Sequence, residues 1–182
     1  MQKHLFKFEK LIINRRKMYF HNLKYFPQIL NLYIKYMQYL EDDFSSIREN
    51  ILTGLLDYIE YVSPHFYLVL CENELCGFFA LENIIGKNQN LYSAYVVTCF
   101  EKKYWGTFTK LAGHSFLKFC FEELGIRKLK AIIYPQNYRV RGILKNCGFV
   151  KEAKLFGETL KDGKPQDLEI YSVFNLKEKK CK

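Results

Sequence analysis

The chain has 182 residues, of which 49% are hydrophobic and 26% are charged, and these proportions are typical of a soluble globular protein. A chain of this length is expected to bury a core without help from disulfides or a metal ion. The formal net charge is +9, but the lysines and arginines fall in separate groups along the sequence. They do not form the basic stripe of a nucleic-acid-binding protein, so the composition argues against a nucleic-acid partner.

The cysteines and the absence of targeting signals bear on location. None of the six cysteines forms a Cys-x-x-Cys pair, and the four histidines are not at ligand spacing from them. This pattern predicts reduced thiols and no metal site. No signal peptide and no apolar run long enough to span a bilayer is evident. We therefore expect a cytoplasmic protein without a membrane partner. It should form a single domain over residues 1–182, with a first strand region at 1–20 and a basic tail at 177–182.

Two amphipathic helices are predicted after the first strand region. Apolar residues recur at helical spacing over residues 25–40, which predicts the first helix. Ser46 and Glu49, three residues apart, match a capping box, and the apolar face then continues to Val62. A second, uninterrupted helix is therefore expected up to Pro64, which ends it.

The apolar pattern then changes to that of strands. Residues 66–71 and 76–85 are predicted to form a hairpin, followed by a polar turn at 86–90 and a third strand at 91–100. The later elements are expected in this order: a helix at 107–124, a strand at 129–133, a helix ending at Asn146, and a hairpin of residues 150–158 and 168–175 around Asp162-Gly163. This order predicts an α/β fold with a central mixed, mostly antiparallel sheet flanked by helices.

Four short segments in the second half of the chain carry a family resemblance. They are, in order, Tyr104-Trp105-Gly106, Ala131-Ile132-Ile133-Tyr134-Pro135-Gln136-Asn137, Asn146-Cys147-Gly148-Phe149-Val150-Lys151-Glu152 and Asp162-Gly163-Lys164-Pro165-Gln166-Asp167. Together with the elements between them they resemble the GNAT N-acetyltransferases, in particular the branch of ribosomal-protein N-terminal acetyltransferases and phage-type members. The resemblance covers about residues 66–174. It implies the GNAT fold and acetyl-CoA as co-substrate.

The resemblance places the pyrophosphate of acetyl-CoA at the turn before the long helix. The first amides of a helix have no intrahelical partner and carry partial positive charge, so they suit an anion. The residues expected to bind it are Lys103, Tyr104, Trp105, Gly106, Thr107, Phe108, Thr109 and Lys110.

This turn departs from the family's motif at three positions. Trp105 stands where relatives have Arg or Gln, and Phe108 and Lys110 stand where they have small residues. A phenylalanine can block the close backbone approach that glycine permits, whereas Thr107 and Thr109 can cap the helix or bond a phosphate. The alternative is that the turn only connects a strand to a helix.

Two residues of the central strands are candidates for catalysis. Tyr95 matches the position where many relatives carry a carboxylate, and its phenol holds its proton at pH 7. Glu82 is the only carboxylate in either central strand, so it is the preferred base. Tyr95 would then orient the amine or protonate the leaving thiolate. Each residue has a structural alternative: Glu82 as a solvent-facing strand residue and Tyr95 as an aromatic on a half-buried sheet face.

The resemblance implies further roles and a reaction. The backbone amides of Val97, Thr98 and Cys99 would hold the developing oxyanion, and Asn137 would bond the pantetheine arm. A primary amine would attack the thioester directly in a ternary complex, without a covalent enzyme intermediate. The acceptor, a small molecule or a protein N-terminus, is not identified by the sequence, and a monomer or homodimer is expected. The alternative is a GNAT-fold binding module that has lost catalysis.

Overall fold

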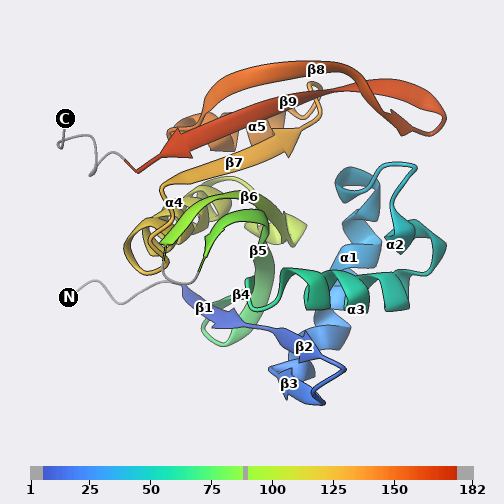
Figure 1. Cartoon of the computed structure of the whole chain (residues 1–182), viewed down its shortest axis with the longest axis vertical. Helices are drawn as coiled ribbons and strands as arrows, with labels where there is room; N and C mark the ends of the chain where they lie inside the picture. The colour runs from blue at the N-terminus through green and yellow to red at the C-terminus, as the bar shows by residue number, and fades with distance from the viewer. Residues whose placement is uncertain (1–5, 88–89, 176–182) are drawn as a thin grey trace. The chain divides into compact units, whose positions relative to one another are not determined.

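The computed structural model describes residues 6–87 and 90–175. In chain order its elements are β1 (Lys7–Lys10), β2 (Ile12–Asn14), β3 (Tyr19–His21), a 3-10 turn (Leu23–Tyr25), α1 (Phe26–Leu40), α2 (Ser46–Glu49), α3 (Ile51–Val62), β4 (Phe66–Cys71), β5 (Glu74–Lys87), β6 (Asn90–Phe100), a second 3-10 turn (Lys102–Tyr104), α4 (Thr107–Glu122), β7 (Lys128–Ile133), α5 (Tyr138–Asn146), β8 (Val150–Lys161) and β9 (Lys164–Phe174) (Figure 1). Seven strands form a sheet in the order β1-β4-β5-β6-β7-β9-β8, while β2 and β3 pair separately. Because β6 and β7 run parallel and β7 and β9 antiparallel, the sheet is mixed, which confirms the predicted fold class.

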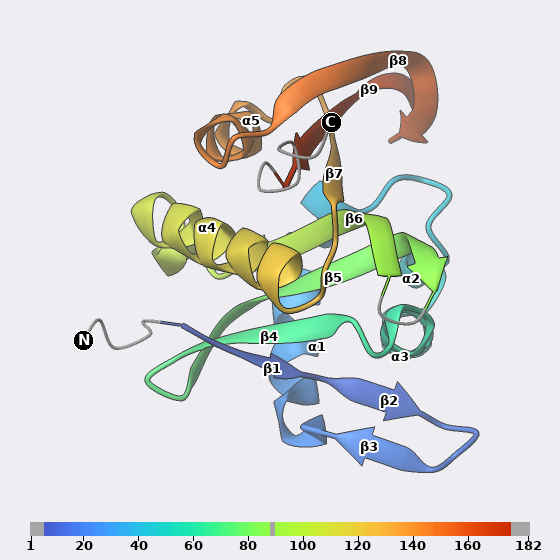
Figure 2. The same cartoon turned by 60° about the vertical axis from the view of Figure 1, so that its left-hand side comes forward.

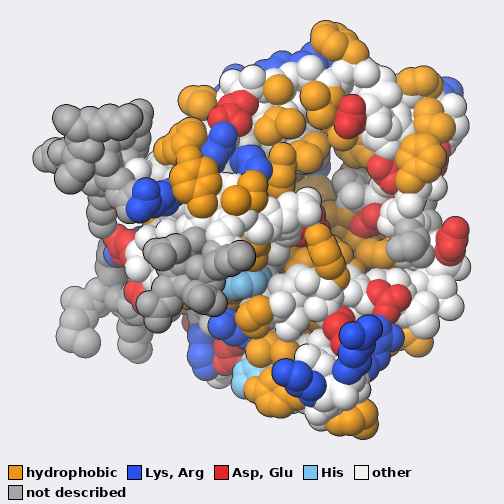
Figure 3. Space-filling model, in the orientation of Figure 1, with side chains coloured by type: hydrophobic (Ala, Val, Ile, Leu, Met, Phe, Trp, Pro, Cys, Tyr) orange, Lys and Arg blue, Asp and Glu red, His pale blue; other side chains and the backbone are white. Residues whose placement is uncertain are grey.

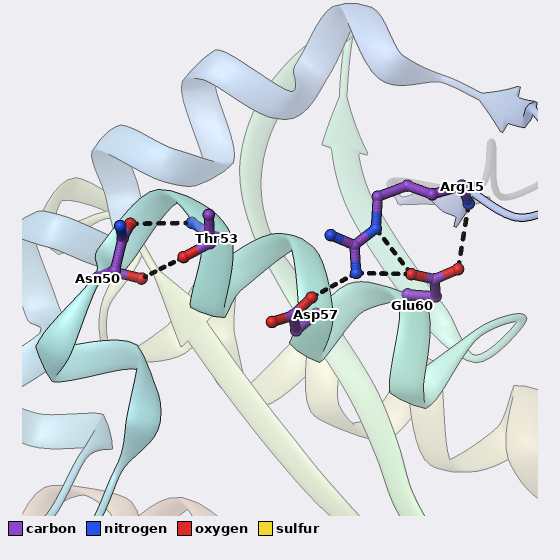
Figure 4. Close-up of polar contacts among 5 residues, drawn as sticks. All are labelled: Arg15, Asn50, Thr53, Asp57 and Glu60. Carbon is purple, nitrogen blue, oxygen red and sulfur yellow. Dashed lines mark hydrogen bonds and ion pairs between the residues drawn. The ribbon is translucent and has the colours of Figure 1, made fainter.

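The predicted elements are confirmed except near the N-terminus and at some boundaries. The expected helix from Ser46 to Val62 is two helices, because Asn50 adopts an extended backbone (φ −145°, ψ 99°) and its side chain accepts a hydrogen bond from the Thr53 amide at 3.2 Å (Figure 4). Ser45 rather than Ser46 caps α2. The first strand region contains three short strands instead of one. The predicted turn at 86–90 lies partly, and the basic tail at 177–182 wholly, outside the described residues.

Internal contacts divide the chain into two compact units that interleave along the sequence. Strands β5, β6, β8 and β9 contribute residues to both. The first unit contains residues 1–81, 97–105 and 159–165, and the second contains 82–96, 106–158 and 166–182.

In the first unit, helices α1 and α3 cover one face of β4 and β5. Phe66 and Phe78, which point to this face from neighbouring strands, stack with ring centroids 4.7 Å apart, and Tyr33 of α1 lies 6.5 Å from Phe78. Arg15, between β2 and β3, ties the hairpin to α3 through an ion pair with Asp57 and a 2.8 Å bond to Glu60 (Figure 4). The core of this unit therefore lies between the sheet and two helices, and these aromatic rings stack within a mainly aliphatic cluster.

In the second unit, α4 and α5 pack together on the same side of the strands (Figure 2). Their buried residues include Ala112 and Phe116 of α4 and Leu144 of α5. Gly113 permits the close packing, because a Cβ at this position would lie 3.2 Å from the Cys147 sulfur. Among the described residues of the second unit, no helix lies on the opposite face of these strands.

We expect Gly77→Ala to destabilise the protein. A Cβ at Gly77 would overlap the carbonyl oxygen of Cys99 and lie 2.8 Å from the Phe100 ring, so the two strands would have to separate. Overpacking of this kind costs about 1–3 kcal/mol. The matched control is Gly142→Ala in α5, where a Cβ meets nothing within 4 Å and alanine is the better helix former. Urea denaturation should show a loss for the first variant and none for the second; equal stabilities would contradict the packing.

Candidate functional site

The pairing of β6 with β7 is short. The parallel register runs from Ser93 with Lys128 to Tyr95 with Lys130, whereas β6 continues to Phe100. Of the three residues predicted to hold the oxyanion, Val97 packs against the core of the first unit and the Thr98 hydroxyl donates a 2.9 Å bond to the Phe78 carbonyl. Cys99 is buried, and burial raises the pKa of its thiol to about 12. The side chains of these residues are thus engaged in packing, and only their backbone groups suit the predicted role.

The turn after β6 is anchored in the first unit by Trp105. Its indole N–H donates a 2.8 Å bond to the Phe100 carbonyl, and its ring lies 5.6 Å from the ring of Tyr36. The side chain of Trp105, predicted to stand at the position of the family's Arg or Gln, thus packs against the core of the first unit. The prediction that Trp105 binds the cofactor stays a prediction beside these structural contacts.

Tyr36 of α1 and Glu101 also hold this turn, and neither was singled out from the sequence. The Tyr36 hydroxyl accepts a 2.9 Å bond from the Lys102 amide and donates to Glu101 at 3.2 Å. Lys35 completes the group with a 2.7 Å ion pair to Glu101. In the sequence, Tyr36 showed only the helical spacing of a core residue, so nothing revealed that its hydroxyl would reach a turn 66 positions later.

Lys103 and Tyr104 occupy the middle of the turn. The Lys103 ammonium forms an ion pair with Glu74 and lies 4.8 Å from the centroid of the Tyr104 ring. Partial burial raises the pKa of Tyr104 to about 12, so the phenol is neutral at physiological pH. Both residues are thus held in place within the first unit, and Lys103 is neutralised in part by Glu74.

In the second unit, α4 begins at Thr107 directly after Gly106. Gly106 has φ 94° and ψ −123°, a conformation that L-residues rarely adopt, and a Cβ there would meet nothing within 4 Å. Gly106 is the N-cap residue and has no side chain, so no N-cap side chain competes with an anion for the first amides of α4. Thr107 is exposed, Phe108 and Lys110 are half-buried and Thr109 is buried.

The two catalytic candidates share one face of the sheet. Phe78 and Ala80 of β5 belong to the same core cluster as Val97 and Cys99 of β6. Because side chains alternate along a strand, Glu82 and Tyr95 continue these two rows on the same face. Both are half-buried, and the Lys130 ammonium lies 4.0 Å from the centroid of the Tyr95 ring. The second unit thus combines a carboxylate, a phenol and a cation on the face that α4 and α5 leave uncovered.

Asn137 ends the loop after β7. Its side-chain oxygen accepts a 3.2 Å bond from the Val140 amide, which makes it the N-cap of α5. Its predicted contact with pantetheine remains a prediction beside this capping role. Within residues 6–87 and 90–175, no group of three or more His, Cys, Asp or Glu side chains could hold a metal ion.

A buried carboxylate that sequence reasoning missed organises the second unit. Glu169 of β9 is only 6% exposed and binds Lys151 of β8 at 2.7 Å, Arg141 of α5 at 3.3 Å and the Tyr171 hydroxyl at 3.1 Å. The hydrogen bond from Lys151 is the main cause that holds the pKa of Glu169 below its usual value. This cluster joins a helix and two strands on the face opposite Glu82 and Tyr95, so its role is structural.

Comparison with known proteins identifies the family. The model of the acetyltransferase (GNAT) domain matches residues 36–150, which is more than half of the chain. The chain therefore belongs to the GNAT acetyltransferases, as the sequence motifs indicated. No curated protein sequence matches it. Among the helices that the structure describes, none is long and apolar enough to cross a membrane.

Solved structures show the same fold at low sequence identity. A chimera of spermidine N-acetyltransferase from Vibrio cholerae and hSSAT has a TM-score of 0.72 at 20% identity, with 93% of this chain and 95% of that chain covered. Spermidine N-acetyltransferase from Vibrio cholerae in complex with CoA and spermine has a TM-score of 0.69 at 20% identity, with 94% and 96% covered. Ribosomal-protein-S5-alanine acetyltransferase from Vibrio fischeri has a TM-score of 0.68 at 15% identity, with 96% of both chains covered.

We expect Glu169→Gln to destabilise the protein in a pH-dependent manner. The substitution leaves Arg141 and Lys151 without their carboxylate, which should cost about 2 kcal/mol, less than for a fully buried pair because the Lys151 side chain is 42% exposed. Since the pKa of Glu169 is lowered by folding, its contribution is complete above about pH 5 and is lost as the pH falls below about 4.

The measurement is urea denaturation of wild type and variant at pH 7 and pH 3.5. The difference in unfolding free energy should be large at pH 7 and shrink at pH 3.5. Glu158→Gln, on an exposed residue of the same β8 strand, is the control and should change neither value. A difference that does not depend on pH would show that the charge of Glu169 is not what stabilises the cluster.

Proposed function

We propose that the protein transfers an acetyl group from acetyl-CoA to a primary amine. The observation that carries the proposal is the start of α4, where the N-cap residue Gly106 adopts a positive φ and has no side chain that would compete with an anion. A Cβ at Gly106 would meet nothing within 4 Å, so space for a pyrophosphate oxygen exists beside the helix end. These amides and the exposed Thr107 hydroxyl are the donor set that suits two phosphate groups.

The substituted motif residues are compatible with this role. Phe108 is half-buried and Thr109 is buried, so neither projects fully from the helix start. Lys110, also half-buried, lies one turn along α4 and adds a positive charge near the amides. Because Trp105 is committed to the core and Lys103 to Glu74, we expect phosphate recognition to depend on the backbone amides of α4 more than on basic side chains.

On the amine side, we propose Glu82 as the general base. Its position on the same face as Tyr95 supports this assignment, because both strands then direct a polar group to the face that α4 and α5 leave uncovered. Acetyl-CoA supplies the acetyl group as a thioester. Glu82 accepts the proton that the amine nitrogen loses, directly or through a water molecule, as the C–N bond forms and the C–S bond of the thioester breaks. CoA leaves as a thiolate, and the Tyr95 hydroxyl orients the amine or protonates this thiolate. The backbone amides of Val97 to Cys99 are proposed as the oxyanion donors.

No cysteine is assigned a role in this reaction. Burial raises the pKa values of Cys99 and Cys147, so both remain thiols at neutral pH and are poor nucleophiles. Direct transfer without a covalent enzyme intermediate is therefore the proposed route. We propose as acceptor a primary amine on a small molecule or a protein N-terminus.

Acetyl-CoA should raise the melting temperature by several degrees at millimolar concentration, because a ligand that binds only the folded state stabilises it. Pantetheine, which lacks the pyrophosphate, should give a much smaller shift. Thr107→Glu places a carboxylate at the proposed phosphate site and should weaken acetyl-CoA binding at least tenfold. It should not lower the stability of the unliganded protein, since acidic residues favour helix N-termini.

Thr107→Gln, which carries no charge, is the matched control and should bind acetyl-CoA more tightly than Thr107→Glu, with only the smaller loss that follows from removal of the hydroxyl. No shift with acetyl-CoA, measured by differential scanning fluorimetry and calorimetry, would reject the cofactor proposal. The remaining interpretation would then be a GNAT-fold binding module that has lost catalysis.

Glu82→Gln should lower kcat by roughly a hundredfold or more, the usual contribution of a general base. Tyr95→Phe should be the milder change, because the ring under the Lys130 ammonium is retained and only the hydroxyl is lost. The assay follows release of the CoA thiol with a panel of amines that includes spermidine and a peptide with N-terminal alanine. Near-normal turnover in Glu82→Gln, with unchanged acetyl-CoA affinity, would reject the base assignment.

A further inference from the structure

Strand β8 forms one end of the seven-stranded sheet. The strand order ends at β8, and both views show it at the outer edge beyond β9 (Figures 1 and 2). An edge strand presents unpaired backbone groups, and proteins usually protect such an edge with charges, bulges or short length. Here β8 runs for 12 residues, and two large apolar side chains on it are exposed: Val150 at 63% and Phe156 at 77%.

The regular part of this edge is seven residues long. Gly157 has a positive φ of 57°, which interrupts the extended backbone directly after Phe156. Val150, Glu152, Lys154 and Phe156 alternate along this part and therefore share one face, and all four are exposed. Figure 3 shows hydrophobic and basic side chains side by side over the area of β7, β8 and β9. Ala153 is the central residue of the segment.

We propose that residues 150–156 pair with the same residues of a second copy of this chain, antiparallel and centred on Ala153, so that the sheet continues across a homodimer. A two-fold axis through Ala153 places Val150 of each copy opposite Phe156 of the other. It also places Glu152 of each copy opposite Lys154 of the other. Both exposed apolar residues are then covered and both charged residues meet the opposite sign.

Neighbouring registers lack this complementarity. In an antiparallel pair, directly opposed side chains lie on the same face of the sheet, which requires the two-fold axis to pass through a residue and not between two residues. The next candidate registers are therefore those with the axis at Glu152 or at Lys154. The first sets Glu152 opposite itself, and the second sets Lys154 opposite itself. Directly opposed like charges are destabilising, which leaves the register at Ala153.

The two charged residues of this segment, Glu152 and Lys154, already form ion pairs within the sheet. Glu152 binds Lys128 of β7 at 2.6 Å, and Lys154 binds Asp167 of β9 at 2.7 Å. These partners lie on the inner side of β8, so the outer side of each charged group can meet the second copy. A single ladder of seven residues buries less area than a large obligate interface, so the dimer should depend on concentration.

The first test is sedimentation velocity of the full chain between about 1 and 100 µM, where a concentration-dependent dimer is expected. Phe156→Asp should raise the dissociation constant at least tenfold. Phe44→Asp, at a residue 71% exposed in the first unit, is the matched control and should leave it unchanged. A monomer at all concentrations would overturn the proposal. So would a dimer that Phe156→Asp does not weaken.

The second test is disulfide cross-linking, which reports the register. Opposed residues in an antiparallel pair have Cα atoms about 4.5–5.5 Å apart, within the range of a disulfide. In a background with Cys71→Ser and Cys181→Ser, Ala153→Cys should cross-link to itself on oxidation. Val150→Cys alone should not, because its two copies would be about 20 Å apart.

A mixture of Val150→Cys and Phe156→Cys proteins should form the mixed disulfide. Failure of Ala153→Cys to cross-link in a dimeric protein would overturn the register, and with it the proposed interface. Neither test uses acetyl-CoA or an amine, so the outcome does not depend on the proposed enzymatic function.

Discussion

The stacking of Phe78 between Phe66 and Tyr33 determines which face of β5 the helices of the first unit cover. Because side chains alternate along a strand, this choice also decides the orientation of every residue further along β5. A shift of one position would turn Glu82 to the side on which α4 and α5 lie in the second unit. The proposed chemistry of the second unit thus depends on aromatic packing in the first part of the same strand.

In the turn between β6 and α4, the side chain of Trp105 serves packing, and the proposed binding of an anion is left to the backbone. The indole of Trp105 bonds to the Phe100 carbonyl and its ring contacts Tyr36, so the residue predicted to match a polar family position packs against the core. In the proposed function, recognition of an anion depends on the backbone amides of α4, which every residue type except proline supplies. The conformation of Gly106 is the one local requirement of that arrangement, since φ 94° is costly for other residues.

Several features could be predicted because their causes are local. Apolar periodicity located α1, α3 and the strands, and Asp162 and Gly163, both with positive φ, form the two-residue turn of the last hairpin as their chemistry indicated. The interruption between helices α2 and α3 at Asn50 could not be predicted from the apolar periodicity. The apolar pattern continues across it, and only the extended backbone and the side-chain bond to Thr53 reveal that a new helix begins there.

The sequence by itself determined the family, the order of the elements and the candidates Glu82, Tyr95 and the α4 turn, because short motifs and periodicity depend on neighbours along the chain. Only the tertiary structure decided which polar groups serve the fold. Glu169 looked like any strand carboxylate, yet it is buried beneath Arg141 and Lys151, which come from a helix and a strand distant in sequence. Likewise Lys103 looked available for a phosphate but pairs with Glu74. Such pairings depend on which elements fold together, and no local pattern encodes the distance between two side chains that are far apart in the chain.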